Sequence, residues 1–199
     1  MFNHRYRLYI IFTILLAGGL GLVFLVSNNY YPILLVNGEP ISAHRFWAVY
    51  QSAARYYQNV LTTYASQSSS SLPNLLSGGS SQRQLEASVL DQLVEASLIA
   101  EGIRQEVGPE ADTLVAGRIK KYRDNANLSR AAQALYGLSY SDFEAEVLIP
   151  QAQKDIMSGR LFLKGQKIED WLVQARTAAQ VTIFSSAFSW DGKAVTIKK

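Results

Sequence analysis

The pattern of apolar and polar residues begins with one long apolar run. Residues 8–26 carry no charge over 19 positions, and at ~1.5 Å per helical residue this length matches the ~30 Å hydrocarbon layer of a bilayer. Arg5 and Arg7 precede the run, and the next basic residue is Arg45. This bias predicts a cytoplasmic N-terminus at 1–7, a single-pass transmembrane anchor at 8–26, and a domain on the extracytoplasmic side of the cell membrane, in the periplasm or at the cell surface.

A cleaved signal peptide is the alternative for the same segment. Ser27 suits the position before a cleavage site, but Leu25 is too large for the position two residues earlier, and the run is long for a signal peptide. The pattern therefore favours an anchor that stays attached. A mature chain beginning near Asn28 would contradict it.

After this run, apolar residues recur at intervals of three and four, a spacing typical of amphipathic helices. Ser42, Ser81 and Ser139 are predicted to cap the helices that begin there, and Pro150 is expected to kink the helix in which it lies. A segment rich in Ser and Gly, 66–81, has no period and predicts a flexible loop. The helices are predicted at 43–64, from Ser81 to 107, from Pro109 to 122, at 128–135, from Ser139 to 163, and at 168–178.

The first predicted helix carries more aromatic residues than its burial requires. At ~100° per residue its apolar arc covers close to half of the circumference, whereas a surface helix needs a stripe of only ~100° or somewhat more. Trp47 and Tyr56 lie at the two margins of this arc, Tyr57 lies within it, and Arg45 and Ser52 lie on the opposite, polar side. Core packing is one role for such side chains, and the rim of an apolar groove that accepts extended polypeptide segments is the other. The candidate peptide-binding residues are Trp47, Tyr50, Tyr56 and Tyr64.

The last part of the chain changes to a period of two, which is typical of strands. An Asp-Gly pair at 191–192 predicts a tight turn, and so a hairpin at 181–198. A two-stranded hairpin alone is marginal in water, and the other strand-like segment of the sequence is 33–36. The sequence therefore predicts a small antiparallel sheet that joins both ends of the extracytoplasmic domain. Pro40 and the cap at Ser42 are expected to prevent a second strand directly after the first, so the Asn-Gly pair at 37–38 should turn the first strand into the following helix.

Composition and charge limit the chemical functions that the chain can have. Of the 19 basic residues, Arg5 and Arg7 precede the apolar run, so 17 basic and 16 acidic residues remain, a near-neutral balance that gives no support for nucleic-acid binding. The chain has no Cys, which excludes disulfides and thiol catalysis. His44 is the one His beyond the predicted anchor, so neither a Ser-His-acid set nor a histidine-based metal site is predicted. No catalytic residue, metal or cofactor is expected.

Three segments together resemble a known family. "VNGEPIS" at 36–42, "LDQLVEASLIAEGIRQEVG" at 90–108 and "YGLSYSDFEAEV" at 136–147 resemble, in order and spacing, the N-terminal chaperone domain of SurA-type foldases, the group that includes PpiD and PrsA. The resemblance covers most of 33–163 and implies a helical, client-binding domain over 33–199. The matching positions are Val36, Asn37, Gly38, Ile41, Leu90, Leu93, Val94, Leu98, Ile99, Gly137, Ser139 and Phe143.

The resemblance implies a chaperone more than an enzyme. In that family a parvulin-type prolyl isomerase domain of roughly one hundred residues often follows the helical part, but here only 164–167 join the last two predicted helices. The expected function is therefore a membrane-anchored holdase that binds unfolded or newly translocated polypeptides without covalent chemistry. An adaptor for one protein partner in the envelope is the alternative, and an active prolyl isomerase ranks third.

Overall fold

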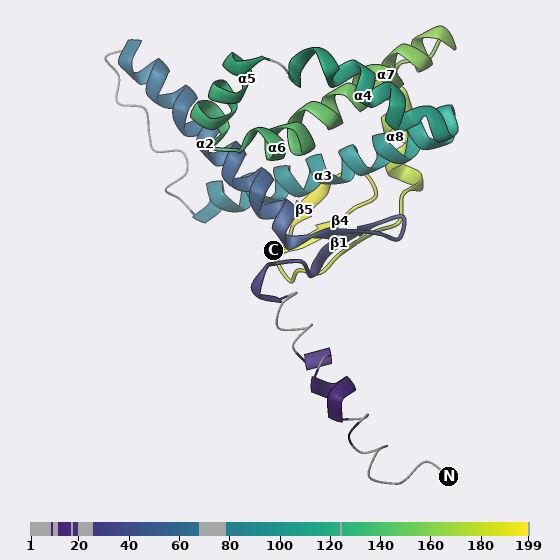
Figure 1. Cartoon of the computed structure of the whole chain (residues 1–199). Coiled ribbons are helices and arrows are strands. Elements are labelled where there is room, and N and C mark those ends of the chain that lie inside the picture. The colour runs from purple at the N-terminus through teal and green to yellow at the C-terminus, as the bar shows by residue number, and fades with distance from the viewer. Residues whose placement is uncertain are drawn as a thin grey trace.

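The computed structural model describes Tyr9 and residues 12–16, 18–19, 26–67, 79–123 and 125–198. The described part of the chain is mainly helical, as the sequence predicts, and it contains two small antiparallel sheets where one was predicted (Figure 1). The helices are α2 (Ala43–Gln67), α3 (Gly79–Val107), α4 (Ala111–Arg123), α5 (Ala126–Ala131), α6 (Tyr140–Phe143), α7 (Ile149–Leu163) and α8 (Ile168–Ala178). A 3₁₀ turn η1 (Gly108–Glu110) and the π-helical turns η2 (Ala132–Tyr136) and η3 (Glu144–Leu148) connect them.

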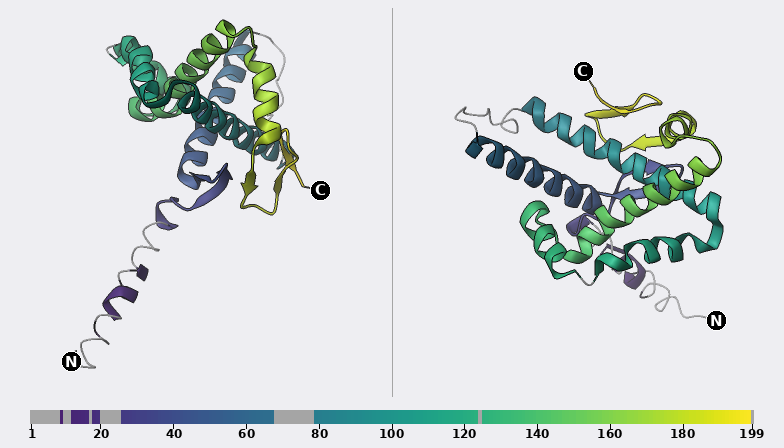
Figure 2. Two further views of the ribbon diagram at one scale, coloured as in Figure 1. Left: turned by 90° about the vertical axis from the view of Figure 1, so that its right-hand side faces the viewer. Right: turned by 90° about the horizontal axis from the view of Figure 1, so that it is seen from above.

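The predicted transmembrane segment, 8–26, lies mostly outside the described residues. Within the described part of the chain, no helix has both the length and the apolar character needed to cross a membrane. Residues 12–16 lie away from the helical body in Figures 1 and 2. Their large apolar side chains are uncovered, and Phe12 and Leu15 are 63% and 69% exposed.

The predicted loop at 66–81 is only partly described. Residues 66–67 end α2 and residues 79–81 begin α3, whereas 68–78 lie outside the described residues. Because α3 begins at Gly79, Ser81 lies inside the helix, and the prediction that it caps the helix is wrong. The caps predicted at Ser42 and Ser139 are confirmed, since their side-chain oxygens accept hydrogen bonds from the backbone N–H groups of Arg45 (3.3 Å) and Asp142 (3.1 Å).

The first strand forms a local hairpin, which contradicts the expected direct turn into the helix. Strand β1 (Pro32–Val36) pairs antiparallel with β2 (Glu39–Ser42). Asn37 and Gly38 form the turn with φ angles of 50° and 86°, the positive values that favour an Asn-Gly pair in a tight hairpin. Pro40 does not prevent this pairing, because β2 is the edge strand of the sheet, where a missing N–H is tolerated.

The two ends of the domain do pair, as the sequence predicts. Strand β3 (Val181–Ile183) lies antiparallel to β1 and completes a sheet with the order β2-β1-β3. The Asn37 side chain strengthens this connection, because its oxygen accepts from the Gln180 N–H (2.9 Å) and its nitrogen donates to Glu101 of α3 (2.6 Å). One turn residue therefore ties the first strand, the last helix–strand connection and α3 together.

The C-terminal hairpin is shorter than predicted. It consists of β4 (Phe188–Trp190) and β5 (Val195–Ile197) in a separate two-stranded sheet, while β3 belongs to the first sheet. Four residues, 191–194, form its turn, and the Asp191 side chain accepts hydrogen bonds from the N–H groups of Lys193 and Ala194, both 2.8 Å. The break between β3 and β4 assigns the two halves of the period-two segment to different sheets.

Helix α3 is common to the two largest groups of buried side chains. Its N-terminal half packs with α2 and both sheets around fully buried residues such as Leu34 and Val94. Its C-terminal half packs against α7 and α8 through Ile103 and Met157. At Gly102 a Cβ atom would lie 2.6 Å from Trp171 of α8, so the absence of a side chain permits this close packing.

Near Pro150 the helical hydrogen-bond pattern widens. The N–H of Ile149 donates to the carbonyl of Glu144, five residues earlier, which gives the π-helical turn η3. Pro150 then stands in the first turn of α7, a position where its missing N–H costs little. The sequence locates the irregularity, and the structure shows a π turn immediately before the proline.

Candidate functional site

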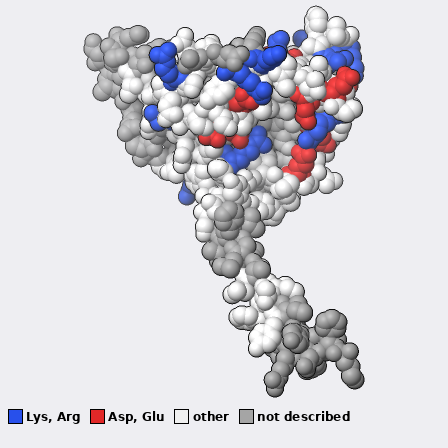
Figure 3. Space-filling view, in the orientation of Figure 1, with Lys and Arg blue, Asp and Glu red and all other residues white. Residues whose placement is uncertain are grey.

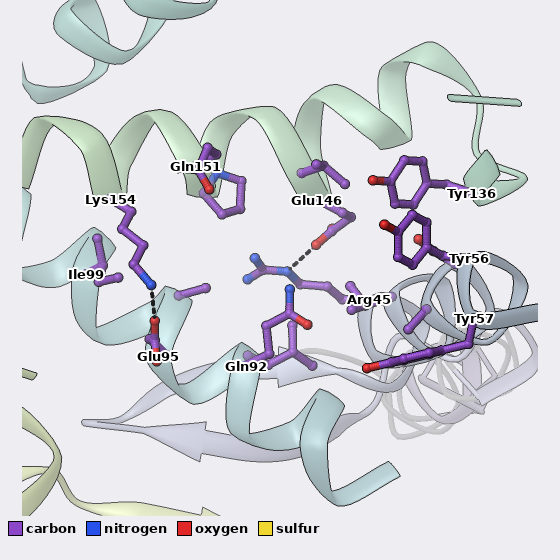
Figure 4. A pocket seen from close by; sticks show the side chains of 17 residues that line it. Arg45, Tyr56, Tyr57, Gln92, Glu95, Ile99, Tyr136, Glu146, Gln151 and Lys154 are labelled. Carbon is purple, nitrogen blue, oxygen red and sulfur yellow. Dashed lines mark hydrogen bonds and ion pairs between the residues drawn. The ribbon is translucent and has the colours of Figure 1, made fainter. Parts of the chain in front are cut away.

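A cleft with a volume of about 430 Å³ lies between α2, α3 and α7 (Figure 4). This volume is within the range of small-ligand and peptide side-chain pockets. Both charged and apolar groups line it, and the π turns η2 and η3 contribute to the wall opposite α3. Its principal lining residues are Arg45, Val49, Tyr56, Gln92, Glu95, Ile99, Tyr136, Glu146, Gln151 and Lys154.

Two contacts fix α2 as a wall of this cleft. Near the start of the helix, Nε of Arg45 donates to Oε2 of Glu146 in η3 at 2.9 Å, across the cleft (Figure 4). Fourteen residues further along, the Asn59 side-chain nitrogen donates to the carbonyls of Ala134 and Leu135 in η2, both at 3.0 Å. Helix α2 is therefore bound to the opposite wall both near its start and beyond its middle.

Stacked tyrosines form one end of the cleft. The rings of Tyr56 and Tyr136 are nearly parallel, with an interplanar angle of 9° and centroids 5.3 Å apart, and Tyr136 also contacts Phe143 at 5.4 Å. Burial raises the pKa of Tyr136, and the neighbouring Tyr56 raises it further. The Tyr136 hydroxyl therefore stays neutral near pH 7. The more exposed Tyr57 lies at the edge of the same end.

Ion pairs form the other end. Lys154 of α7 donates to Glu95 of α3 at 2.9 Å, and Arg176 of α8 donates to the second Glu95 oxygen at 2.8 Å. Burial works to raise the pKa of Glu95, but hydrogen bonds from Lys154 and Arg176 outweigh it and lower the pKa below its ordinary value. Glu95 is therefore held ionised at the cleft wall.

The same ion pairs connect the cleft to the C-terminal hairpin. Arg176 also makes two hydrogen bonds to Asp91, at 2.8 and 3.1 Å, and one to the carbonyl of Lys193. Asp91 in turn accepts from the N–H of Val195 in β5 at 3.1 Å. The hairpin is thus attached to α3 at Asp91, one helical turn from the cleft residue Glu95.

These groups suit binding more than covalent chemistry. Both carboxylates of the lining, Glu95 and Glu146, already have cationic partners, and no His lines the cleft. Among the described residues, no group of three or more His, Cys, Asp and Glu side chains is placed to hold a metal ion. The amides of Gln92 and Gln151 can both donate to and accept from a polypeptide backbone.

The four predicted peptide-binding residues do not form one rim. Tyr56 lines the cleft, but Trp47 and Tyr50 do not; they contact Phe46, and their ring centroids are 5.5 Å apart. Tyr50 packs against the core cluster that contains Leu85 and Val89 from the N-terminal half of α3, and burial, and then the charge of Glu86, raises its pKa. The side chain of Tyr64 lies outside the described residues.

Sequence reasoning missed the residues from other elements. Tyr136 directly precedes Gly137, which ends η2 in a left-handed conformation with a φ of 72°. This Tyr-Gly pair was the only feature of the sequence that pointed to Tyr136. Glu146 and Lys154 are separated from α2 by about a hundred residues, and helix periodicity carries no information about such contacts.

No family model matches this chain, and no curated protein or solved structure is significantly similar to it. The cleft therefore has to be interpreted from its own side chains.

Proposed function

We propose that this protein is a membrane-anchored extracytoplasmic chaperone that holds unfolded or newly translocated polypeptide segments in the cleft between α2, α3 and α7. The observation that carries the proposal is the composition of this cleft. It combines the stacked pair Tyr56 and Tyr136 with aliphatic side chains and with the amides of Gln92 and Gln151. The resemblance to the chaperone domain of SurA-type foldases supports the same function.

An extended polypeptide suits such a cleft better than a small polar metabolite. Polypeptides present apolar side chains, which aromatic and aliphatic surfaces accept with little sequence preference, and backbone amides, which glutamine side chains pair with. Because the charged groups Arg45–Glu146 and Lys154–Glu95 already neutralise each other, a ligand needs no particular net charge. This combination favours many clients bound weakly over one bound tightly.

The uncovered apolar residues near the N-terminus support the membrane anchor. Phe12, Ile14 and Leu15 are more than 60% exposed, and the helical body does not cover them. Exposed apolar surface of this kind requires an apolar environment, which a bilayer supplies.

The test is suppression of aggregation by the full-length chain in detergent micelles or nanodiscs. At stoichiometric amounts, the protein should keep a chemically denatured client soluble, and the double variant Tyr56→Ala/Tyr136→Ala should lose most of this effect. Phe162→Ala is the matched control, because Phe162 is an aromatic residue that is 78% exposed outside the cleft. Equal protection by the wild type and the double variant would contradict the role of the cleft.

An adaptor for one envelope protein is the second candidate. It is favoured by Phe162 and Leu163, which are 78% and 81% exposed at the end of α7 and offer an apolar site for a folded partner. Photo-crosslinking in cells from position Tyr57, at the edge of the cleft, and from Phe162 separates the candidates. A broad set of adducts from Tyr57 supports the chaperone, whereas one dominant adduct from Phe162 supports the adaptor.

A further inference from the structure

Three exposed aromatic side chains lie where the chain enters the domain. Tyr30 and Tyr31 directly precede β1 and are 50% and 41% exposed. Phe184, which is 54% exposed, comes from the far end of the sequence, yet its N–H donates to the carbonyl of Ile33 at 2.8 Å. The pairing of β1 with β3 therefore brings the three rings to the same end of the sheet.

A basic residue lies at the same end. The N–H of Lys198 donates to the carbonyl of Ala187, and its side-chain nitrogen lies 3.4 Å from the carbonyl of Ser185, next to Phe184. On the face shown in Figure 3, almost all charged side chains gather over the upper part and one edge of the body, and the lower part near the start of β1 is largely uncharged. We name Tyr30, Tyr31, Phe184 and Lys198 the sheet-end surface.

The segment before β1 is fixed to the domain. The carbonyls of Asn29 and Tyr31 accept hydrogen bonds from the N–H groups of His44 (2.7 Å) and Ala43 (2.9 Å) at the start of α2. The Tyr30 ring also packs edge-on against His44, with centroids 5.2 Å apart. These contacts leave little free chain between the apolar run and the folded domain.

The short connection limits how far this surface can lie from the end of the apolar run. Three residues lie between Val26 and Tyr30, so the chain takes four steps, which at ~3.5 Å per residue span at most about 14 Å. The headgroup region adds about 5–7 Å to each side of the hydrocarbon layer, so even a fully extended connection keeps the two tyrosines close to the headgroups. A protein partner would have to fit into this narrow space, whereas lipid headgroups already fill it.

We propose that the sheet-end surface rests in the headgroup region of the bilayer and thereby fixes the orientation of the domain on the membrane. This inference rests on the proposed membrane anchor. Tyrosine is favoured at membrane–water interfaces because its ring is apolar and its hydroxyl is polar, and a lysine beside it attracts anionic headgroups. The α7–α8 turn, on the opposite side of the body in Figures 1 and 2, then points away from the membrane.

The absence of Cys allows a direct test, because a single introduced Cys gives one labelling site. The variants are Ser186→Cys, exposed beside the sheet-end surface, and Gln166→Cys, exposed in the α7–α8 turn. Each full-length protein is labelled with a fluorophore and reconstituted into phosphatidylcholine vesicles containing phosphatidylglycerol, with or without nitroxide-labelled headgroups. We expect quenching of at least about threefold at position 186 and almost none at position 166.

A second set of variants separates membrane contact from simple proximity. The triple variant Tyr30→Ser/Tyr31→Ser/Phe184→Ser, made in the Ser186→Cys background, should stay folded by circular dichroism, because the three rings are each about half exposed and none belongs to the buried core. It should lose most of the quenching. Phe162→Ser in the same background is the matched control and should keep it. Vesicle-bound protein with equally weak quenching at both positions, or a triple variant quenched like its parent, overturns the fixed orientation. Protein that does not float with the vesicles overturns the membrane anchor itself.

Discussion

Trp47 and Tyr56 are both 39% exposed and both belong to α2, yet they have different surroundings. Trp47 contacts Phe46 and Tyr50 near the start of the helix, where α2 packs on the main core. Tyr56 stacks on Tyr136 across the cleft. With the same exposed fraction, the Trp47 ring therefore extends the core, whereas the Tyr56 ring lines the open cleft.

The difference between these two groups lies in what holds them. The first group, Phe46, Trp47 and Tyr50, is built from residues of one helix and is held by apolar contact with the core. The second, Tyr56 with Tyr136, is assembled from two elements and is flanked by ion pairs. Changes in the first group should therefore act on folding, and changes in the second on binding.

The largest expected effect is that of Phe46→Ala. Phe46 is 7% exposed and contacts both other rings of the first group, so its loss leaves a cavity that should lower the free energy of unfolding by about 3–4 kcal/mol. Urea denaturation followed by circular dichroism measures this value. Tyr57→Ala is the matched control on the same helix and should cost less than about 1 kcal/mol, because Tyr57 is 52% exposed. Similar losses in both variants would remove the distinction between the two groups.

An intermediate effect is expected from acid, because ion pairs flank only the second group. The pKa of Glu95 is lower in the folded chain than its ordinary value of 4.5, so the ion pair stabilises the fold above that pH. The stabilisation, about 1.5 kcal/mol for hydrogen bonds to a charged group, should be lost as the pH falls through 4.5 and through the lower folded value.

The variant Glu95→Gln isolates this contribution. It should be less stable than the wild type at pH 7, and its free energy of unfolding should decrease less between pH 6 and pH 3. Asp155→Asn removes a more exposed carboxylate from α7 and serves as the control, which should follow the wild-type pH dependence. A Glu95→Gln profile parallel to that of the wild type would show that the pair does not stabilise the fold.

Much of the fold follows from local sequence patterns. The helix at 168–178 and the N-caps at Ser42 and Ser139 are confirmed because each depends on residues within one or two turns. The Asn-Gly pair at 37–38 was misread because Pro40 and the cap at Ser42 were taken as barriers to a second strand. An edge strand of four residues accommodates both the proline and the cap.

The cleft was less predictable, because its walls come from distant parts of the chain. Helix periodicity separated the polar and apolar faces of α2 only in part, because Ser52 of the predicted polar side is 6% exposed and Tyr57 of the predicted apolar side is 52% exposed. It also could not tell which neighbour covers each face. Arg45 was assigned to the polar face, yet it crosses the cleft to Glu146, a hundred and one residues later. Only the packing of η2 against α2, which stacks Tyr136 on Tyr56, distinguishes the rim residue Tyr56 from Trp47.

The smallest effect is the sharpest test of the comparison between Trp47 and Tyr56. An unstructured fluorescent peptide rich in Leu and Phe should bind Tyr56→Ala about 3–10-fold more weakly than the wild type, since one aromatic contact is worth about 0.7–1.4 kcal/mol. Trp47→Ala should change the affinity less than about twofold but should lower the unfolding midpoint, because its ring contacts the core and not the cleft. Fluorescence anisotropy and urea denaturation on the same samples give both quantities. The reverse result, weaker binding for Trp47→Ala alone, would place the peptide on the first group and return the site to the rim that the sequence alone predicts.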